Sequence, residues 1–322
     1  MKEISVYEVE SSFYDYYSKC GYDIIPEVPT YPSPDESVLF IGAQISTWKP
    51  KVLSETPIGS IANPQTCIRT QNLDYYSDSS RAMNFCTVFR THGVLTDKSL
   101  NEAITESYEY LNNVLNIPDE EILVKTSTEL LGRFACQATT EIDTEIADYY
   151  VWEYGHPRLS GEGITYALKN PDGAFHDIGN VIEIRRDGET VAVEWGFGEE
   201  VISQAMMGGY HPLVHSRYLP DSVKDGLDTP IETRIADAAL AIVVMSGLGV
   251  EPSNRHAGDV LSKYMHRFGE LAAISGMKSA ERILDNVAEY NHPNSSTVSD
   301  IISESYRLAG KSIYKNTTAR YN

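Results

Sequence analysis

Four residues near the middle of the chain, two polar and two glycines, are spaced so that they could together contact a ligand. Asn180 and Glu194 are polar residues on two segments in which apolar and polar residues otherwise alternate, and Gly196 and Gly198 follow Glu194 closely. Two glycines where a strand turns into a helix let the backbone come close to a flat or anionic ligand. The same residues also fit an ordinary surface hairpin with a tight turn, and taken alone they leave both interpretations open.

The segment that carries these residues, 177–201, predicts a β-hairpin that leads into a helix. The strands are expected at Asn180–Ile184 and Thr190–Trp195, joined by a turn at 186–189 in which Gly188 supplies a positive φ at little cost. The residues that follow Gly198, EEVISQAMM, have helical spacing.

A second candidate site residue is Arg69, which lies at the end of a short predicted strand. Thr66–Arg69 reads as a strand, a polar loop follows, and Arg81–Phe89 forms a second run of strand-like residues. A hairpin of this kind could hold a phosphate through Arg69, because a guanidinium presents a fork of donors to phosphate oxygens. The alternative is an exposed strand-end arginine with a carboxylate partner.

The remaining segments must position these residues, and their patterns predict a mixed chain followed by a helical one. We place a domain boundary between residues 215 and 216, with a mixed domain at 1–215 and an all-helical domain at 216–322. Helices are expected at 7–20, 100–115, both ends of 128–148, and in several runs after Pro230, and further strands at Val38–Ala43, Ile122–Thr126 and Ile164–Leu168.

The composition excludes several classes of protein. The 322 residues include 46 acidic against 26 basic side chains, a net charge of −20, which disfavours avid tRNA or DNA binding and suits a small molecule or nucleotide. No apolar stretch approaches the roughly 18 residues of a membrane span, and the acidic N-terminus lacks a signal core, so we expect a cytoplasmic protein with no membrane partner. Four cysteines without a CxxC pair argue against a zinc site or a disulfide framework.

The order of these segments resembles the catalytic half of alanyl-tRNA synthetase, a class II aminoacyl-tRNA synthetase, over about residues 10–275. The opening helix and motif 1 resemble FYDYYSKCGYDIIP, which ends at Pro26, and the Cys-x-Arg of motif 2 resembles Cys67-Ile68-Arg69. Further matches are NEAITESYEYLNNVLNIP, the FW-x-MG loop at 151–155, and motif 3 at 193–198. The later segment RIADAALAIVVMSGLGVEPSN resembles the opening of the domain that reads the tRNA acceptor stem.

This resemblance implies an α+β fold, with a class II synthetase-like antiparallel sheet flanked by helices and an all-helical C-terminal domain. It also implies a pocket for a small amino acid. Trp152 and Asn180 would line that pocket, and Glu194 stands where the family uses an aspartate to hold the α-amino group. Gly196 and Gly198 would lie against the adenosine.

The resemblance implies nucleotide and tRNA contacts as well. Arg69 would bind the α-phosphate of ATP or of an aminoacyl-adenylate, and magnesium would be needed only if ATP is used. Asn254 stands where the family contacts the tRNA acceptor stem, although the basic residues around it are fewer here. The oligomeric state is left open.

The departures from the family pattern concern the triphosphate and the tRNA. Val201 replaces the motif 3 arginine that clamps the γ-phosphate, and Glu199 adds a negative charge nearby. The polar residues of the motif 2 loop are replaced by TQNLDYY, with Arg90 and His92 as possible substitutes. We therefore expect a truncated, divergent paralogue that does not charge tRNA from free ATP and amino acid.

Three functions fit these expectations. The first is an enzyme that moves a small aminoacyl group, with alanyl as the expected one, to or from an acceptor such as a nucleoside or a small metabolite in a biosynthetic pathway. Its donor would be charged tRNA or an adenylate. The second is an ATP-dependent ligase that activates an amino acid. The third is a non-catalytic module that binds an amino acid or a nucleotide.

Overall fold

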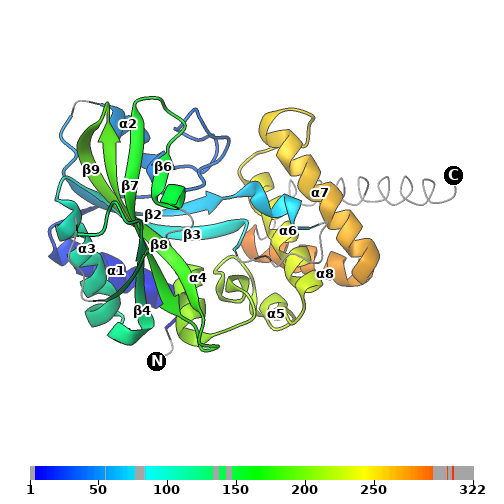
Figure 1. Cartoon of the computed structure of the whole chain (residues 1–322). Coiled ribbons are helices and arrows are strands. Elements are labelled where there is room, and N and C mark those ends of the chain that lie inside the picture. Colours follow the sequence, from blue (N-terminus) through cyan, green and yellow to red (C-terminus); the bar gives the residue numbers. More distant parts are fainter. Residues whose placement is uncertain are drawn as a thin grey trace. The chain divides into compact units, whose positions relative to one another are not determined.

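The chain folds into two compact units in the computed structural model (Figure 1), which describes residues 4–54, 56–76, 83, 85–132, 138–142, 147–292, 303 and 307. Unit 1 comprises Met1–Thr66 and Arg90–Gly208, and unit 2 comprises Cys67–Phe89 and Gly209–Asn322. Unit 2 therefore contains a segment, 67–89, that the sequence analysis assigned to the first domain.

A nine-stranded mixed sheet runs through the described part of the first two hundred residues, in the order β1-β2-β3-β9-β8-β7-β4-β5, with β6 paired to β7. The pairs β1–β2 and β4–β5 are parallel, and the central pairs β3–β9, β9–β8, β8–β7 and β7–β4 are antiparallel. The predicted α+β class is confirmed, and the sheet departs from an antiparallel one at its two edges. The strands are β1 (Asp23–Ile24), β2 (Ser60–Ile68), β3 (Val88–Thr96), β4 (Ile122–Thr126), β5 (Thr139–Ile142), β6 (Val151–Glu153), β7 (Leu159–Lys169), β8 (Phe175–Arg186) and β9 (Glu189–Gly198).

The predicted hairpin at 177–201 is confirmed, with strands that extend further than expected. Strands β8 and β9 pair antiparallel, and the turn between them has Asp187 at φ 55° and Gly188 at φ 88°. Two successive positive φ values are the mark of a type I′ turn, which matches the twist of the flanking strands. Helix α4 (Glu199–Met207) follows directly, as the EEVISQAMM spacing predicts.

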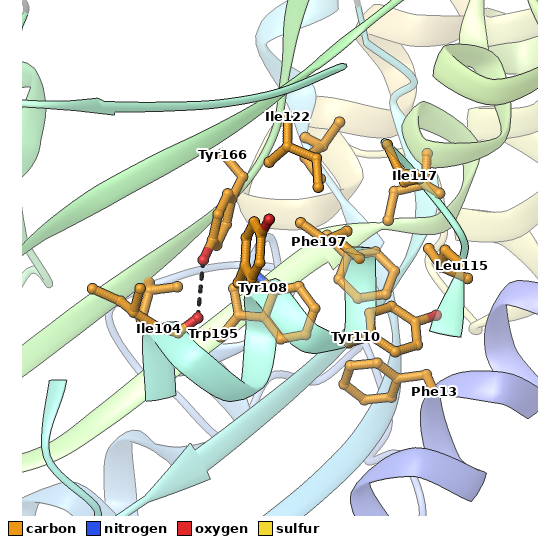
Figure 2. Close-up of a cluster of buried hydrophobic side chains, with 14 of the residues drawn as sticks. Phe13, Ile104, Tyr108, Tyr110, Leu115, Ile117, Ile122, Tyr166, Trp195 and Phe197 are labelled. Atoms are coloured by element: carbon orange, nitrogen blue, oxygen red, sulfur yellow. Dashed lines mark hydrogen bonds between the residues drawn. The ribbon is translucent and has the colours of Figure 1, made fainter. Parts of the chain in front are cut away.

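One face of the sheet is covered by an aromatic core (Figure 2). Helices α1 (Val6–Lys19) and α3 (Leu100–Glu109) each begin with a capping box, in which a serine and the glutamate three residues later bond each other's backbone N–H groups. Phe13 of α1 lies 5.7 Å from Trp195 and 5.3 Å from Phe197, measured between ring centroids. The Tyr166 hydroxyl donates to the Ile104 carbonyl at 3.1 Å. Alternate residues of β9 are thereby committed to this core.

The opposite face of the sheet carries a smaller apolar cluster. Helix α2 (Ile45–Leu53) contributes Ile45 and Trp48, and the sheet contributes Leu95, Ile182 and others. Because side chains of a strand alternate between faces, Glu194 points to this side while its neighbours Val193 and Trp195 point to the aromatic core.

The described part of unit 2 is largely helical, apart from the strand ends at 67–68 and 88–89. Its buried centre includes Asp237, which accepts hydrogen bonds from Asn72 Nδ2 at 2.9 Å, Tyr76 Oη at 2.6 Å, and Thr87 N and Oγ1 at 2.8 and 2.6 Å. One carboxylate thus anchors the segment 67–89. Among its described residues, the α-helices with assigned bounds are α5 (Asp221–Lys224), α6 (Pro230–Gly247), α7 (His256–Ser275) and α8 (Met277–Asn291). Among the described residues, no helix is both long and apolar enough to cross a membrane.

Three sequence-based elements are wrong or only partly described. The expected strand at Val38–Ala43 is irregular, with Val38 and Leu39 exposed, because only part of this apolar run has a core to bury against. The arm expected at Arg81–Phe89 begins as a strand only at Val88, and residues 77–82 and 84 lie outside the described part. The start of 128–148 forms turns rather than a helix, strand β5 follows, and a 3₁₀ turn occupies Ala147–Tyr150; residues 133–137 and 143–146 are not described.

Candidate functional site

Five of the predicted site residues share one face of the sheet in unit 1. In the antiparallel pair β8–β9, Asn180 lies opposite Gly196 and Ile182 lies opposite Glu194. Residues that face each other, and residues two apart on one strand, point to the same side. Gly198 therefore belongs to this face, and so does Trp152, because it lies opposite Gly161, which in turn lies opposite Ile184. We call this surface the Asn180–Glu194 face.

Glu194 is a buried carboxylate with one hydrogen-bond donor beside it. Its side chain is 7% exposed, and the Tyr154 hydroxyl donates to Oε1 at 3.0 Å. Burial raises the pKa of Glu194 to about 7, and the Tyr154 hydrogen bond, which favours the ionised form, opposes this rise. The carboxyl therefore titrates near neutral pH and is poised to gain a cationic partner.

Asn180 offers the opposite hydrogen-bonding character. Its Oδ1 accepts the hydroxyl of the buried Thr165 at 2.8 Å, which turns the amide Nδ2 into the group available for recognition. Asn180 and Glu194 are diagonal neighbours on adjacent strands, a separation that a small ligand can bridge. The face thus presents an N–H donor beside a carboxylate acceptor.

Glycines form the floor between these polar groups. A Cβ on Gly163 would lie 2.0 Å from the Val181 carbonyl oxygen, and one on Gly93 would lie 2.6 Å from Gln44 Cγ, so both positions require glycine. At Gly196 the nearest side-chain atom would be Gln44 Cβ at 3.7 Å, which is ordinary contact. Gln44 therefore borders the face next to Gly196. Its amide is fixed by Asn63 Oδ1 at 2.7 Å.

Arg69 and Asn254 belong to unit 2, in two separate segments of the chain. Arg69 follows β2, is exposed, and lies with its guanidinium 5.0 Å from the Phe89 ring centroid, and its backbone N–H donates to the Thr87 carbonyl at 2.8 Å. Asn254 is exposed in the loop before α7. Their predicted roles toward phosphate and tRNA stay predictions.

Alanine in place of Arg69 should weaken binding of adenosine monophosphate analogues about ten-fold or more, because a guanidinium makes charge-assisted hydrogen bonds to phosphate oxygens. Calorimetric titration measures the change. The matched control is Arg158→Ala, which removes an exposed arginine paired with Asp187 at the β8–β9 turn. Equal affinity in Arg69→Ala and the wild-type protein would contradict a role of Arg69 in binding the phosphate.

Three further residues, which were not predicted from the sequence, shape this face: Gln44, Tyr154 and Thr165. Tyr154 had a usable signal, because it lies two residues after Trp152 and so shares its side of the chain. Gln44 and Thr165 had none, since their contacts involve residues far away in the sequence. Within the described ranges, no group of three or more His, Cys, Asp or Glu side chains is placed to hold a metal ion.

Comparisons with known proteins find similarity to tRNA synthetases of class II. Residues 8–144 match the family model of tRNA synthetases class II (A). The alanine–tRNA ligase of Thermotoga maritima is 25% identical over 345 aligned residues, which cover 90% of this chain and 39% of that protein. The enzyme of the same name from Sphingopyxis alaskensis is 23% identical and covers 85% of the chain and 36% of its own length. Over most of its length the chain is therefore similar in sequence to alanine–tRNA ligases.

This chain spans about two fifths of the length of the alanine–tRNA ligases that it matches. A solved structure of Desulfitobacterium hafniense PylSc, a pyrrolysyl tRNA synthetase, aligns with 66% of this chain and 72% of its own at a TM-score of 0.40 and 13% sequence identity. The similarity to tRNA synthetases of class II is one of sequence.

Two of the residues at which the chain departs from the alanine–tRNA ligase pattern, Val201 and Glu199, lie away from the Asn180–Glu194 face. Val201 packs against the aromatic core. The sequence predicted a negative charge from Glu199 near the triphosphate. In the structure Glu199 is fully buried, and its Oε2 lies 2.7 Å from His92 Nε2. His92 lies opposite Phe197 and therefore points to the aromatic core as well.

Arg90 lies on the same side as His92, two residues before it on β3. Its guanidinium is paired with Glu10 at 3.2 Å and Glu27 at 3.3 Å, and its backbone N–H donates to Glu200 Oε1 at 3.1 Å. Neither Arg90 nor His92 therefore replaces the missing motif 2 side chains on the Asn180–Glu194 face.

Leucine in place of His92 should destabilise the protein by about 2 kcal/mol or more, because the imidazole bonds both Glu199 and the Tyr14 hydroxyl, and hydrogen bonds to charged groups contribute about 1.5–3 kcal/mol. Urea denaturation measures the loss. His176→Leu, at an exposed position of β8, is the control and should change little. A His92→Leu protein as stable as the wild type would show that this buried network is dispensable.

Proposed function

We propose that the chain binds an α-aminoacyl group on the Asn180–Glu194 face and transfers it to an acceptor other than a complete tRNA. The observation that carries this proposal is the pairing of a fixed amide donor at Asn180 with a buried carboxylate at Glu194 above a glycine floor. An α-aminoacyl group has complementary chemistry, with a carbonyl oxygen that accepts and an ammonium that donates. The small size of the group, such as alanyl, follows from the resemblance to alanine–tRNA ligases.

Burial makes Glu194 a selective partner for that ammonium. A carboxylate that has lost its hydration gains strongly from a cation brought to within hydrogen-bonding distance. Binding the ammonium favours the ionised carboxyl and so lowers the raised pKa of Glu194. Ligand affinity should therefore increase as the pH rises toward 7 and then level off, until the ligand's own amine loses its proton.

The proposed donor of the aminoacyl group is an aminoacyl-adenylate or an aminoacyl ester. Val201, packed against the core, stands where the family has the arginine that clamps the γ-phosphate, so contacts to a triphosphate are reduced. Gly196 and Gly198 would lie against the adenosine of an adenylate, and a role of Arg69 toward its phosphate stays a separate prediction. Magnesium would enter only with ATP.

The transfer itself needs little beyond positioning. A hydroxyl or amine of the acceptor attacks the carbonyl carbon, the bond between that carbon and the donor oxygen breaks, and the acceptor's proton leaves with the donor or to water. Asn180 would hold the carbonyl oxygen, on which negative charge develops during attack, and Glu194 would hold the ammonium. Holding both reacting ends is the chief contribution of such a site. A nucleoside or a small metabolite of a biosynthetic pathway is the proposed acceptor.

The test supplies the purified protein with radiolabelled alanine in two forms. In one arm the alanine arrives as free amino acid with ATP and magnesium, and in the other as alanyl-tRNA or alanyl-adenylate, each with a panel of nucleosides and small amines. The proposal expects product in the second arm, lost in Glu194→Ala. Binding of the donor without product from any acceptor would point to a non-catalytic module and contradict the transfer.

An ATP-dependent ligase that activates an amino acid is the second candidate. The observation in its favour is the similarity to alanine–tRNA ligases across 90% of the chain. Pyrophosphate exchange with alanine, glycine and serine separates the two candidates. Exchange above the blank would favour the ligase, and a flat result for all three amino acids would exclude it.

A further inference from the structure

Tyr154 is held at both ends within unit 1, and the second end is Glu194. Its backbone carbonyl accepts a hydrogen bond from the Lys49 ammonium at 2.6 Å, and its hydroxyl donates to Glu194 Oε1 at 3.0 Å. Lys49 is itself buried, donates to Ser37 Oγ at 2.8 Å, and forms an ion pair with the buried Asp35. The hydrogen bonds to Lys49 and to Glu194 together fix the position of Tyr154.

The Tyr154 ring passes over Gly161 to reach Glu194. A Cβ on Gly161 would lie 2.6 Å from the Tyr154 hydroxyl oxygen and 3.0 Å from its Cε2. The same Cβ would lie 2.6 Å from Ile182 Cγ2. The absence of a side chain at Gly161 is therefore a condition for the contact between Tyr154 and Glu194.

In this arrangement the Lys49 ammonium is kept apart from the Glu194 carboxylate. Lys49 could neutralise a nearby acid, but its charge is taken up by Asp35, and what reaches Glu194 is the neutral hydroxyl of Tyr154. A neutral donor orients a carboxylate without cancelling its charge. The cross-strand neighbours of Glu194, Leu95 and Ile182, are apolar, and Tyr154 is the titratable side chain that acts on it.

We propose that Tyr154 is the positioning residue of the site: it holds Oε1 of Glu194, so that Oε2 is the oxygen that meets the ammonium of the aminoacyl group. Lys49 and Asp35 keep Tyr154 in place through its backbone. The identity of the ligand in this inference rests on the proposed function, whereas the link between Tyr154 and Glu194 does not.

The first measurement tests that link without any ligand. The Glu194 carboxyl is followed by carbon NMR of protein labelled at glutamate, with its signal assigned by Glu194→Gln. Because the hydroxyl favours the ionised form, the pKa of Glu194 should be higher in Tyr154→Phe than in the wild type. Gly161→Ala, which displaces the ring while keeping the hydroxyl, should shift it in the same direction. An unchanged titration midpoint in both variants would overturn the proposal.

The second measurement compares two probes by calorimetry at pH 8. One is 5′-O-(N-alanylsulfamoyl)adenosine, and the other is its counterpart without the amino group. Tyr154→Phe should weaken the first probe about ten-fold or more and leave the second within two-fold. In a Glu194→Gln background the added Tyr154→Phe change should have no further effect, as expected of residues that act through one another.

The outcomes separate this inference from the proposed function. If the wild-type protein binds neither probe but the NMR midpoint moves, the proposed function fails while the link between Tyr154 and Glu194 stands. If the wild-type protein binds the alanyl probe and Tyr154→Phe binds it equally well, the positioning role is wrong and the proposed function is unaffected.

Discussion

Glutamine in place of Glu194 should remove most of the affinity for an aminoacyl ligand and also make the free protein more stable in mildly alkaline solution. Loss of one partner of a buried charge pair costs about 2–5 kcal/mol of binding free energy, which corresponds to roughly 30-fold or more in affinity. The gain in stability has a separate cause, namely the cost of keeping an ionised carboxyl buried.

The sign of the stability change follows from the two pKa values of Glu194. The carboxyl titrates at its ordinary value of 4.5 in the unfolded chain and at about 7 in the folded protein, because burial disfavours the charge. The folded state therefore binds the proton more tightly, and this contribution is complete below pH 4.5 and lost as the pH rises through 7. A shift of this size corresponds to about 3 kcal/mol.

Urea denaturation across this pH range checks the prediction. Glu194→Gln should match the wild type near pH 4 and exceed it in free energy of unfolding by up to about 3 kcal/mol at pH 8. The control is Glu189→Gln, an exposed glutamate on the same strand. If both variants change the pH profile equally, the carboxyl of Glu194 is not buried as described.

Alanine in place of Asp237 should give the largest loss of stability. Four hydrogen bonds from Asn72, Tyr76 and Thr87 converge on this carboxylate in the interior of unit 2. Each donor left buried without an acceptor costs about 1–3 kcal/mol, so the free energy of unfolding should fall by about 3 kcal/mol or more. The matched control, Asp228→Ala, removes an exposed aspartate of the same unit and should change little.

The same substitution should also disturb Arg69. Thr87 connects the two residues, because its backbone carbonyl accepts the Arg69 N–H while its own N–H and hydroxyl bind Asp237. Denaturation and binding of an adenosine monophosphate analogue, measured on one preparation, test both effects. An Asp237→Ala protein of wild-type stability would contradict the anchoring role.

The hairpin and its polar residues could be predicted because their signals are local. Alternation with a period of two, followed by Asp187-Gly188, specifies two strands and a tight turn within about twenty residues. That period also places Asn180, Glu194 and the two glycines on one face, once the register is known. The family resemblance supplied the pairing with Trp152.

What could not be predicted depends on contacts between distant parts of the chain. Tyr154 and Glu194 are 40 residues apart, and Asp237 is 150 residues from Thr87. From the sequence we expected the carboxylate of Glu199 to lie near a bound triphosphate. The sequence does not reveal that this carboxylate is buried against His92. The apolar run at Val38–Ala43 has strand composition, yet it pairs with none of the strands in the described part of the chain.

The most direct test of the central claim is a crystal structure of the protein with 5′-O-(N-alanylsulfamoyl)adenosine. The account predicts the ligand's ammonium within about 3 Å of Glu194 Oε2 and its alanyl carbonyl oxygen at a similar distance from Asn180 Nδ2. A ligand bound away from this face, or one whose ammonium meets a different carboxylate, would contradict it.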